Sequence, residues 1–207
     1  DEKWSKAIAA LKLALDANGV AYEAVEGEAA FYGPKADFMA KDALGREWQL
    51  STIQIDFIQP ARLGVEYIGE DGQPHTPVLI HRAVTGSTER FMGVMIEHFA
   101  GAFPAWLAPV QAMIIPISDE KHGAYGRALK ARFEAAGLRV EIDESKDRMQ
   151  AKIRRAQLQK VPYMLIIGGK EQEAGAVAVR LRNGEDLGAM PVADFVERAR
   201  ADIAAKI

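Results

Sequence analysis

The chain has 207 residues, and this length predicts one or two domains at roughly 150 residues each. Its hydrophobic fraction of 49% and charged fraction of 27% exclude a disordered or fibrous chain. With 26 Lys and Arg against 29 Asp and Glu, the net charge of −3 excludes a uniformly basic nucleic-acid-binding protein, so any RNA contact must come from a local patch. The absence of Cys excludes a disulfide framework, a thiol nucleophile and Cys-based zinc sites, and favours a cytoplasmic protein.

An uncharged stretch over residues 99–117 is long enough to cross a membrane. Pro104, Pro109 and Pro116 interrupt it, so we interpret it as a domain junction followed by a buried strand and expect no membrane association. The charged residues 1–3 begin an amphipathic segment and lack the pattern of a secretory signal.

The first half of the chain changes from helical to strand periodicity. Apolar residues at helical spacing predict a helix over residues 2–18 that ends at Gly19. Strands are expected next over residues 22–25, 35–41, 47–57 and 77–83. Gly86-Ser87 begins a second helix, whose apolar face is formed by Phe91, Val94, Met95 and Phe99.

The second half alternates strands with helices. Strands are expected over residues 111–117, 138–142, 161–167 and 176–181. Helices are expected over residues 125–136, 149–156 and 192–207. The alternation predicts an α/β domain with a mixed, largely parallel sheet, whereas the first half is an antiparallel α+β domain. We expect the two domains to span residues 1–107 and 108–207.

The predicted strand over residues 47–57 has one polar face. Strict alternation places Thr52, Gln54 and Asp56 together with Leu50, and places the apolar residues on the other face. Such a face either lines a pocket or is a solvated sheet surface.

The helix that begins at Ser87 has a cation in its first turn. Ser87 is a good N-cap, but Arg90 opposes the helix dipole by a few tenths of a kcal/mol. An anion such as phosphate bound at the helix N-terminus would compensate for this, as would a neighbouring surface carboxylate.

Histidine is sparse, and no two histidines have the spacing of a helical metal site. His81 ends an apolar strand immediately before Arg82. Its residue context fits a partly buried, hydrogen-bonded histidine as well as a metal ligand.

One segment concentrates positive charge. Residues 146–160 contain a single acid, Asp147, and the basic residues Lys146, Arg148, Lys152, Arg154, Arg155 and Lys160. Arg148, Lys152 and Arg155 share one helical face, which predicts a solvated basic surface or a site for a phosphate backbone.

Several runs of residues together resemble one family. They are Phe31-Tyr32-Gly33-Pro34-Lys35, Thr52-Ile53-Gln54-Ile55-Asp56-Phe57, Ile80-His81-Arg82-Ala83 and Gly86-Ser87-Thr88-Glu89-Arg90-Phe91. The chain resembles the threonyl-tRNA synthetase family over essentially its whole length, and its Gly86–Phe91 run is similar to motif 3 of class II synthetases. The first half resembles the later part of the class II catalytic core, and the second half resembles the anticodon-binding domain.

This resemblance implies a reaction and assigns roles to residues. The family ligates threonine to its tRNA through an ATP-dependent adenylate, with Mg²⁺ accompanying ATP. Lys35 and Arg90 would be catalytic, with Lys35 near the reacting carboxylate and Arg90 on the phosphates. The threonine pocket would be lined by Tyr32, Gln54 and Ser87. ATP would be bound by Gln49, Thr52 and Arg90.

The resemblance also implies a zinc ion and a set of tRNA contacts. His81 would be one of three protein ligands of a Zn²⁺ ion that binds threonine, and a metal that coordinates the hydroxyl can reject the isosteric valine. The anticodon contacts would be Arg148, Lys152, Arg154, Glu171 and Arg180.

Other parts of the family pattern do not occur in this sequence. They are motifs 1 and 2, the editing domain and the remaining zinc ligands, a Cys and a His. We therefore expect the chain to be inactive alone, and the homodimer that the family forms through motif 1 is not implied for it. The alternatives are a tRNA-binding accessory module without catalysis, and another class II synthetase such as a prolyl or glycyl enzyme.

Overall fold

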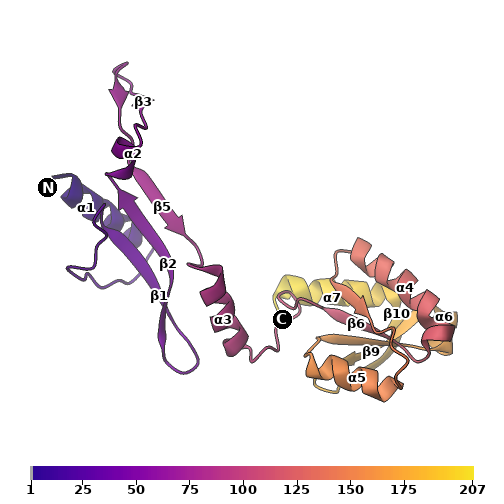
Figure 1. The fold of residues 1–207 in the computed structure, drawn as a ribbon. Coiled ribbons are helices and arrows are strands. Elements are labelled where there is room, and N and C mark those ends of the chain that lie inside the picture. Colours follow the sequence, from indigo (N-terminus) through magenta and orange to yellow (C-terminus); the bar gives the residue numbers. More distant parts are fainter. Residues whose placement is uncertain (1) are drawn as a thin grey trace. The chain divides into compact units, whose positions relative to one another are not determined.

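The structure is a computed structural model that describes residues 2–207. The chain forms two compact units, Asp1–His98 and Phe99–Ile207 (Figure 1). The boundary between the units coincides with the start of the uncharged stretch over residues 99–117. The boundary at residues 107 and 108 stays a prediction.

A three-stranded antiparallel sheet organises the first unit, with β2 in the middle of the order β1-β2-β5 (Figure 1). Its strands are β1 (Lys35–Lys41), β2 (Glu47–Asp56) and β5 (Leu79–Ala83). The helices of this unit are α1 (Glu2–Ala17), α2 (Gln59–Arg62) and α3 (Thr88–His98). The two predicted helices and the strands predicted over residues 35–41, 47–57 and 77–83 are therefore confirmed within a few residues.

Two local features of the first unit differ from the prediction. Residues 22–25 form no strand, because this exposed segment pairs with none of the strands among residues 2–207. Between α2 and β5 lies a small hairpin of β3 (Tyr67–Ile68) and β4 (Pro74–His75), whose two-residue strands are too short to show periodicity.

The second unit contains a mixed five-stranded sheet in the order β10-β9-β8-β6-β7. Strand β6 is parallel to β7 and β8, whereas β9 is antiparallel to β8 and β10. The strands are β6 (Ala112–Pro116), β7 (Val140–Ile142), β8 (Tyr163–Ile167), β9 (Ala176–Leu181) and β10 (Asp186–Pro191). The predicted mixed sheet is confirmed, and β10 is an addition that its Gly- and Pro-containing sequence conceals.

Helices cover both faces of this sheet (Figure 1). They are α4 (Asp119–Ala135), α5 (Met149–Leu158), α6 (Gly169–Ala174) and α7 (Val192–Ala205). On one face, Phe133 of α4 and Phe195 of α7 are fully buried against each other, with ring centroids 5.3 Å apart. On the other face, Ile153 and Ala156 of α5 pack on Met164 and its neighbours. The sheet is therefore buried on both sides, which is usual for parallel strands.

The two units differ in how much apolar surface they bury. Nearly all the buried apolar side chains lie in the second unit, whereas the first contributes only Ala7, Pro34, Ile55 and Pro60 among the described residues. Large apolar side chains of the first unit remain exposed, including Phe31 at 72% and Ile80 at 62%. None of the helices within residues 2–207 is long and apolar enough to cross a membrane.

We predict that Phe133→Ala destabilises the second unit by about 3–5 kcal/mol, because the vacated ring space lies between α4, α7 and the sheet. Urea unfolding followed by circular dichroism measures this loss. The control is Leu158→Ala, at a side chain that is 70% exposed, which should change the free energy of unfolding by less than about 0.5 kcal/mol.

Candidate functional sites

The register of the first sheet brings predicted site residues into one row. Lys35 of β1 is paired with Gln54 of β2, and Gln54 is paired with His81 of β5. Because directly paired residues point to the same side of a sheet, these three side chains share one face. Asp37 and Thr52 form the adjacent row on that face.

A β-bulge adds Gln49 to the same polar face. Phe38 pairs with Ser51 but Met39 pairs with Gln49, so Leu50 is the extra residue in β2. Strict alternation would have placed Gln49 on the opposite face. Gln49 Nε2 instead donates a hydrogen bond to Asp37 Oδ1 over 2.7 Å.

Asp37 connects two of the predicted site residues, although sequence reasoning did not select it. Its carboxylate also forms an ion pair with Lys35 Nζ. Beside it, Thr52 Oγ1 is buried without a hydrogen-bond partner among the described residues. The only sequence signal for Asp37 was its position two residues after Lys35, on the same face of a strand.

Tyr32 reaches this face because Gly33 allows two backbones to approach closely. The Tyr32 hydroxyl donates to Gln54 Oε1 over 2.8 Å, and its ring centroid lies 5.7 Å from that of His81. A Cβ on Gly33 would lie 1.7 Å from the carbonyl oxygen of Ile55. Only glycine permits this approach.

His81 is oriented by a fully buried carboxylate. Asp56 Oδ2 lies 2.9 Å from His81 Nε2, and Asp56 Oδ1 accepts hydrogen bonds from the backbone N–H groups of Ile58 and Gln59. Burial by itself would raise the pKa of Asp56, but these hydrogen bonds outweigh burial and lower the pKa below its ordinary value. With an ionised Asp56, Nε2 of His81 carries the proton and Nδ1 is the nitrogen with a free lone pair.

The N-terminus of α3 lies against the bulge of β2. Gly86 has φ +67° and its Cβ position would be 2.6 Å from the carbonyl oxygen of Leu50, so this approach also requires glycine. Ser87 caps α3, since its Oγ accepts from the Arg90 N–H over 3.2 Å. One Arg90 guanidinium nitrogen donates to the carbonyl oxygen of Gln49 over 3.1 Å, which places its charge beside the polar face. The predicted N-cap is confirmed.

The residues present do not form a complete metal site. Within residues 2–207, no group of three or more His, Cys, Asp or Glu side chains is placed to hold a metal ion. Because Nε2 of His81 faces Asp56, Nδ1 is the nitrogen of this side chain that remains available to a ligand.

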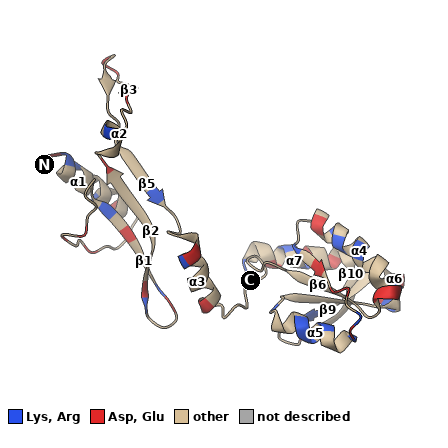
Figure 2. Ribbon diagram, in the orientation of Figure 1, with Lys and Arg blue, Asp and Glu red and all other residues tan. Residues whose placement is uncertain are grey.

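In the second unit, α5 carries basic residues and no acidic ones, while α6 is mainly acidic (Figure 2). The helix predicted over residues 149–156 is confirmed, and its apolar residues Ile153 and Ala156 are buried. Arg148 and Arg154 are exposed. The prediction that Lys152 belongs to an exposed basic face is wrong, because its side chain is 1% exposed.

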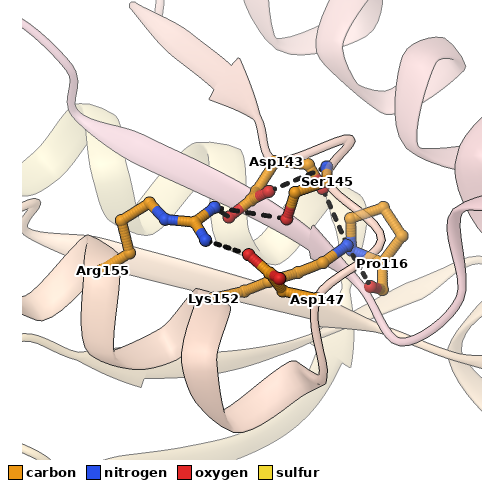
Figure 3. A network of polar contacts seen from close by, with 6 residues as sticks. All are labelled: Pro116, Asp143, Ser145, Asp147, Lys152 and Arg155. Carbon is orange, nitrogen blue, oxygen red and sulfur yellow. Dashed lines mark hydrogen bonds and ion pairs between the residues drawn. The ribbon is translucent and has the colours of Figure 1, made fainter.

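Lys152 points inward and Arg155 pairs with acids, as Figure 3 shows. The Lys152 ammonium donates to two backbone carbonyl oxygens, those of Pro116 over 3.2 Å and Asp143 over 3.0 Å. Arg155 forms ion pairs with Asp143, over 2.8 Å, and with Asp147. The face of Arg148, Lys152 and Arg155 therefore presents less free charge than its sequence indicates.

The two remaining predicted anticodon contacts occupy different places. Glu171 accepts from the Gly168 N–H over 2.9 Å and so caps α6, just after the end of β8. Arg180 of β9 pairs with Met164 near the start of β8, and therefore lies on the sheet face that α5 covers. Its guanidinium contacts Asp186 over 3.1 Å.

Comparison with known proteins divides the chain in the same way. Residues 2–99 match the tRNA synthetase class II core domain (G, H, P, S and T), and residues 111–202 match the anticodon binding domain. A threonine–tRNA ligase from Rubrobacter xylanophilus is 60% identical over all of this chain, and one from Thermus thermophilus is 53% identical over 96% of it. The chain belongs to the threonyl-tRNA synthetase family. It spans 32% of the length of the first of these relatives and 30% of the second.

A solved structure agrees with this family assignment. The RNA-binding domain of threonyl-tRNA synthetase from Cryptosporidium parvum matches 97% of this chain and half of its own chain, with a TM-score of 0.85 and 37% identity. The family predicted from the residue runs is therefore confirmed, and so is the pairing of a class II core segment with an anticodon-binding domain.

We predict opposite effects for one substitution at two glycines. Gly33→Ala should destabilise the first unit by about 1–3 kcal/mol, since its methyl group overlaps the Ile55 carbonyl. Gly93→Ala should stabilise it by about 0.8–1 kcal/mol, because Gly93 lies inside α3 with open space at its Cβ position. Thermal unfolding of the two variants tests this, and destabilisation of similar size by both would contradict it.

We predict that Asp56 contributes to stability at neutral pH and loses that contribution in acid. Because its folded pKa is lowered, the contribution is complete above the unfolded value of about 3.9 and disappears as the pH falls through the folded pKa. The free energy of unfolding of the wild type should therefore approach that of Asp56→Asn as the pH falls below about 3.9. Urea titrations at a series of pH values measure the difference, and a difference that stays constant to the lowest pH would refute the assignment.

Proposed function

We propose that this chain forms part of a cytoplasmic threonine–tRNA ligase, in which the first unit contributes to the site for threonine and ATP and the second unit binds the anticodon. The observation that carries the proposal is the polar face of the first sheet, where Lys35, Gln54 and His81 form one row with Tyr32 above it. The sequence identity of 60% with a threonine–tRNA ligase supports the same reaction.

The proposed reaction joins two anions, the threonine carboxylate and the phosphates of ATP with its Mg²⁺. Lys35 and Arg90 supply cations at neighbouring points of this face, where they orient the reactants and neutralise charge that develops on phosphate. Thr52 Oγ1, buried and without a partner among residues 2–207, offers a hydrogen bond to ATP together with Gln49.

Threonine is assigned to the end of the face near His81. Tyr32 and Gln54 already form a hydrogen bond there, whereas Ser87 lies at the start of α3, beside the bulge of β2. We propose that His81 provides one Zn²⁺ ligand in the whole ligase. We also propose that the whole ligase acts as a homodimer. Coordination of the threonine hydroxyl is the chemistry that this metal would supply.

The second unit is proposed to bind tRNA specific for threonine through its anticodon. Exposed Arg148 and Arg154 suit phosphate contacts, while Glu171 and Arg180 suit base contacts. The anticodon-binding match over residues 111–202 supports this assignment.

The test is threonine-dependent exchange between ATP and pyrophosphate in a whole-length ligase that contains this chain. Arg90→Ala should lower the exchange rate by about 100-fold to 1,000-fold, the usual effect of removing a group that stabilises developing charge. Arg62→Ala, at an exposed arginine of α2 to which no role in the site is assigned, is the matched control and should change the rate by less than about threefold. Equal rates for the two variants, or exchange that depends on another amino acid, would reject the proposal.

A further inference from the structure

The parallel pairing of β6 with β7 ends where Pro116 occurs. The last backbone bond runs from the Asp143 N–H to the Ile114 carbonyl over 2.9 Å. In a regular parallel ladder, residue 116 would next donate to the Asp143 carbonyl, and Ser145 would then donate to the Pro116 carbonyl. Pro116 has no N–H, and the Ser145 N–H donates instead to the Asp143 side chain over 3.0 Å. Two carbonyl groups therefore lose their ladder donors.

Lys152 supplies both missing donors. Its Nζ contacts the Asp143 carbonyl at 3.0 Å and the Pro116 carbonyl at 3.2 Å, and the side chain is 1% exposed (Figure 3). A buried ammonium is retained only where hydrogen bonds and a counter-charge compensate for its lost hydration. The nearly buried carboxylate of Asp143 is that counter-charge.

The same contacts determine the path of the segment that leaves β7. Arg155 reaches Asp143 over 2.8 Å and Ser145 Oγ over 3.2 Å, and it also contacts Asp147. Residues 143, 145 and 147 are thus held by Arg155. The side chains of Lys146 and Arg148, which alternate with them along the chain, are exposed. The segment is ordered before any ligand arrives, which lowers the entropy cost of binding and fixes the geometry of its exposed groups.

We propose that Lys152 is a positioning residue for anticodon discrimination. It does not itself touch the RNA, but it shapes residues 143–148 so that this segment makes a base contact in addition to those proposed for Glu171 and Arg180. This rests on the proposed function, because it assumes that the second unit binds an anticodon. Base contacts depend on direction and distance, whereas phosphate contacts depend mainly on charge. Loss of Lys152 should therefore reduce discrimination between anticodons more than it reduces general affinity for RNA.

The experiment measures binding of the 207-residue chain to two tRNA transcripts at several salt concentrations. One transcript has a threonine anticodon, and the other differs only in its anticodon. Lys152→Met keeps most of the side-chain volume and removes the ammonium. It should lower the ratio of the two affinities by about tenfold, the effect of one disturbed base contact, and leave the salt dependence unchanged. Lys146→Met, the same change at an exposed position, should leave the ratio intact and reduce the salt slope by about 0.7, as expected for one lost phosphate contact.

Each other outcome overturns the proposal in a distinct way. If Lys152→Met reduces the salt slope and keeps the ratio, Lys152 is a phosphate contact. If it lowers the melting temperature but changes neither quantity, Lys152 only stabilises the sheet. If the wild-type chain does not distinguish the anticodons, the proposed function of the second unit fails together with this inference. If the wild type and Lys152→Met distinguish them equally well, the inference alone fails.

A second variant covers the case in which Lys152→Met does not fold. Arg155→Met removes the contacts to Asp143, Ser145 and Asp147 from a half-exposed position, and its charge is already neutralised by two carboxylates. It should lower the affinity ratio in the same direction with an unchanged salt slope. An unchanged ratio in a folded Arg155→Met chain would show that the shape of residues 143–148 is irrelevant to discrimination.

Discussion

The position of β2 between β1 and β5 is the constraint on which the first unit depends. A shift of its register by one residue would turn Thr52, Gln54 and Asp56 to the opposite face and separate them from Lys35 and His81. Several local features fix this register. Gly33 brings the preceding segment onto the Ile55 carbonyl, and the bulge at Leu50 lets α3 start against β2 through Gly86. The arrangement of the polar face and the packing of this unit therefore depend on the same backbone contacts.

The sequence predicted most elements because their apolar residues repeat with a clear period. It failed where structure depends on partners or on breaks in periodicity. Residues 22–25 have strand-like composition but no pairing strand among the described residues. The pairing that exposes Gln49 on the polar face requires a bulge, and alternation alone places this residue on the wrong side. The role of Asp37 could not be predicted because it depends on cross-strand contacts.

Lys152 illustrates a different limit of sequence analysis. A lysine spaced with Arg148 and Arg155 on a helix is normally solvated, and helical spacing says nothing about which side of the helix packs against strand ends. The buried ammonium depends on the missing N–H of Pro116, a residue 36 positions away in the chain. The resemblance to a family identified the fold correctly and strand alternation predicted the polar face, but the burial of this cation required coordinates.

Because buried contacts hold residues 143–148, the backbone path of this segment depends little on its exposed side chains. Lys152 binds the main-chain carbonyl groups of Pro116 and Asp143. The exposed positions 144, 146 and 148 contribute no side chain to those two bonds, so they can accept substitutions while the backbone path persists. A surface segment supported in this way resembles a hypervariable loop on a rigid framework. Its sequence can diverge between lineages and follow changes in the RNA partner without remodelling the sheet beneath it.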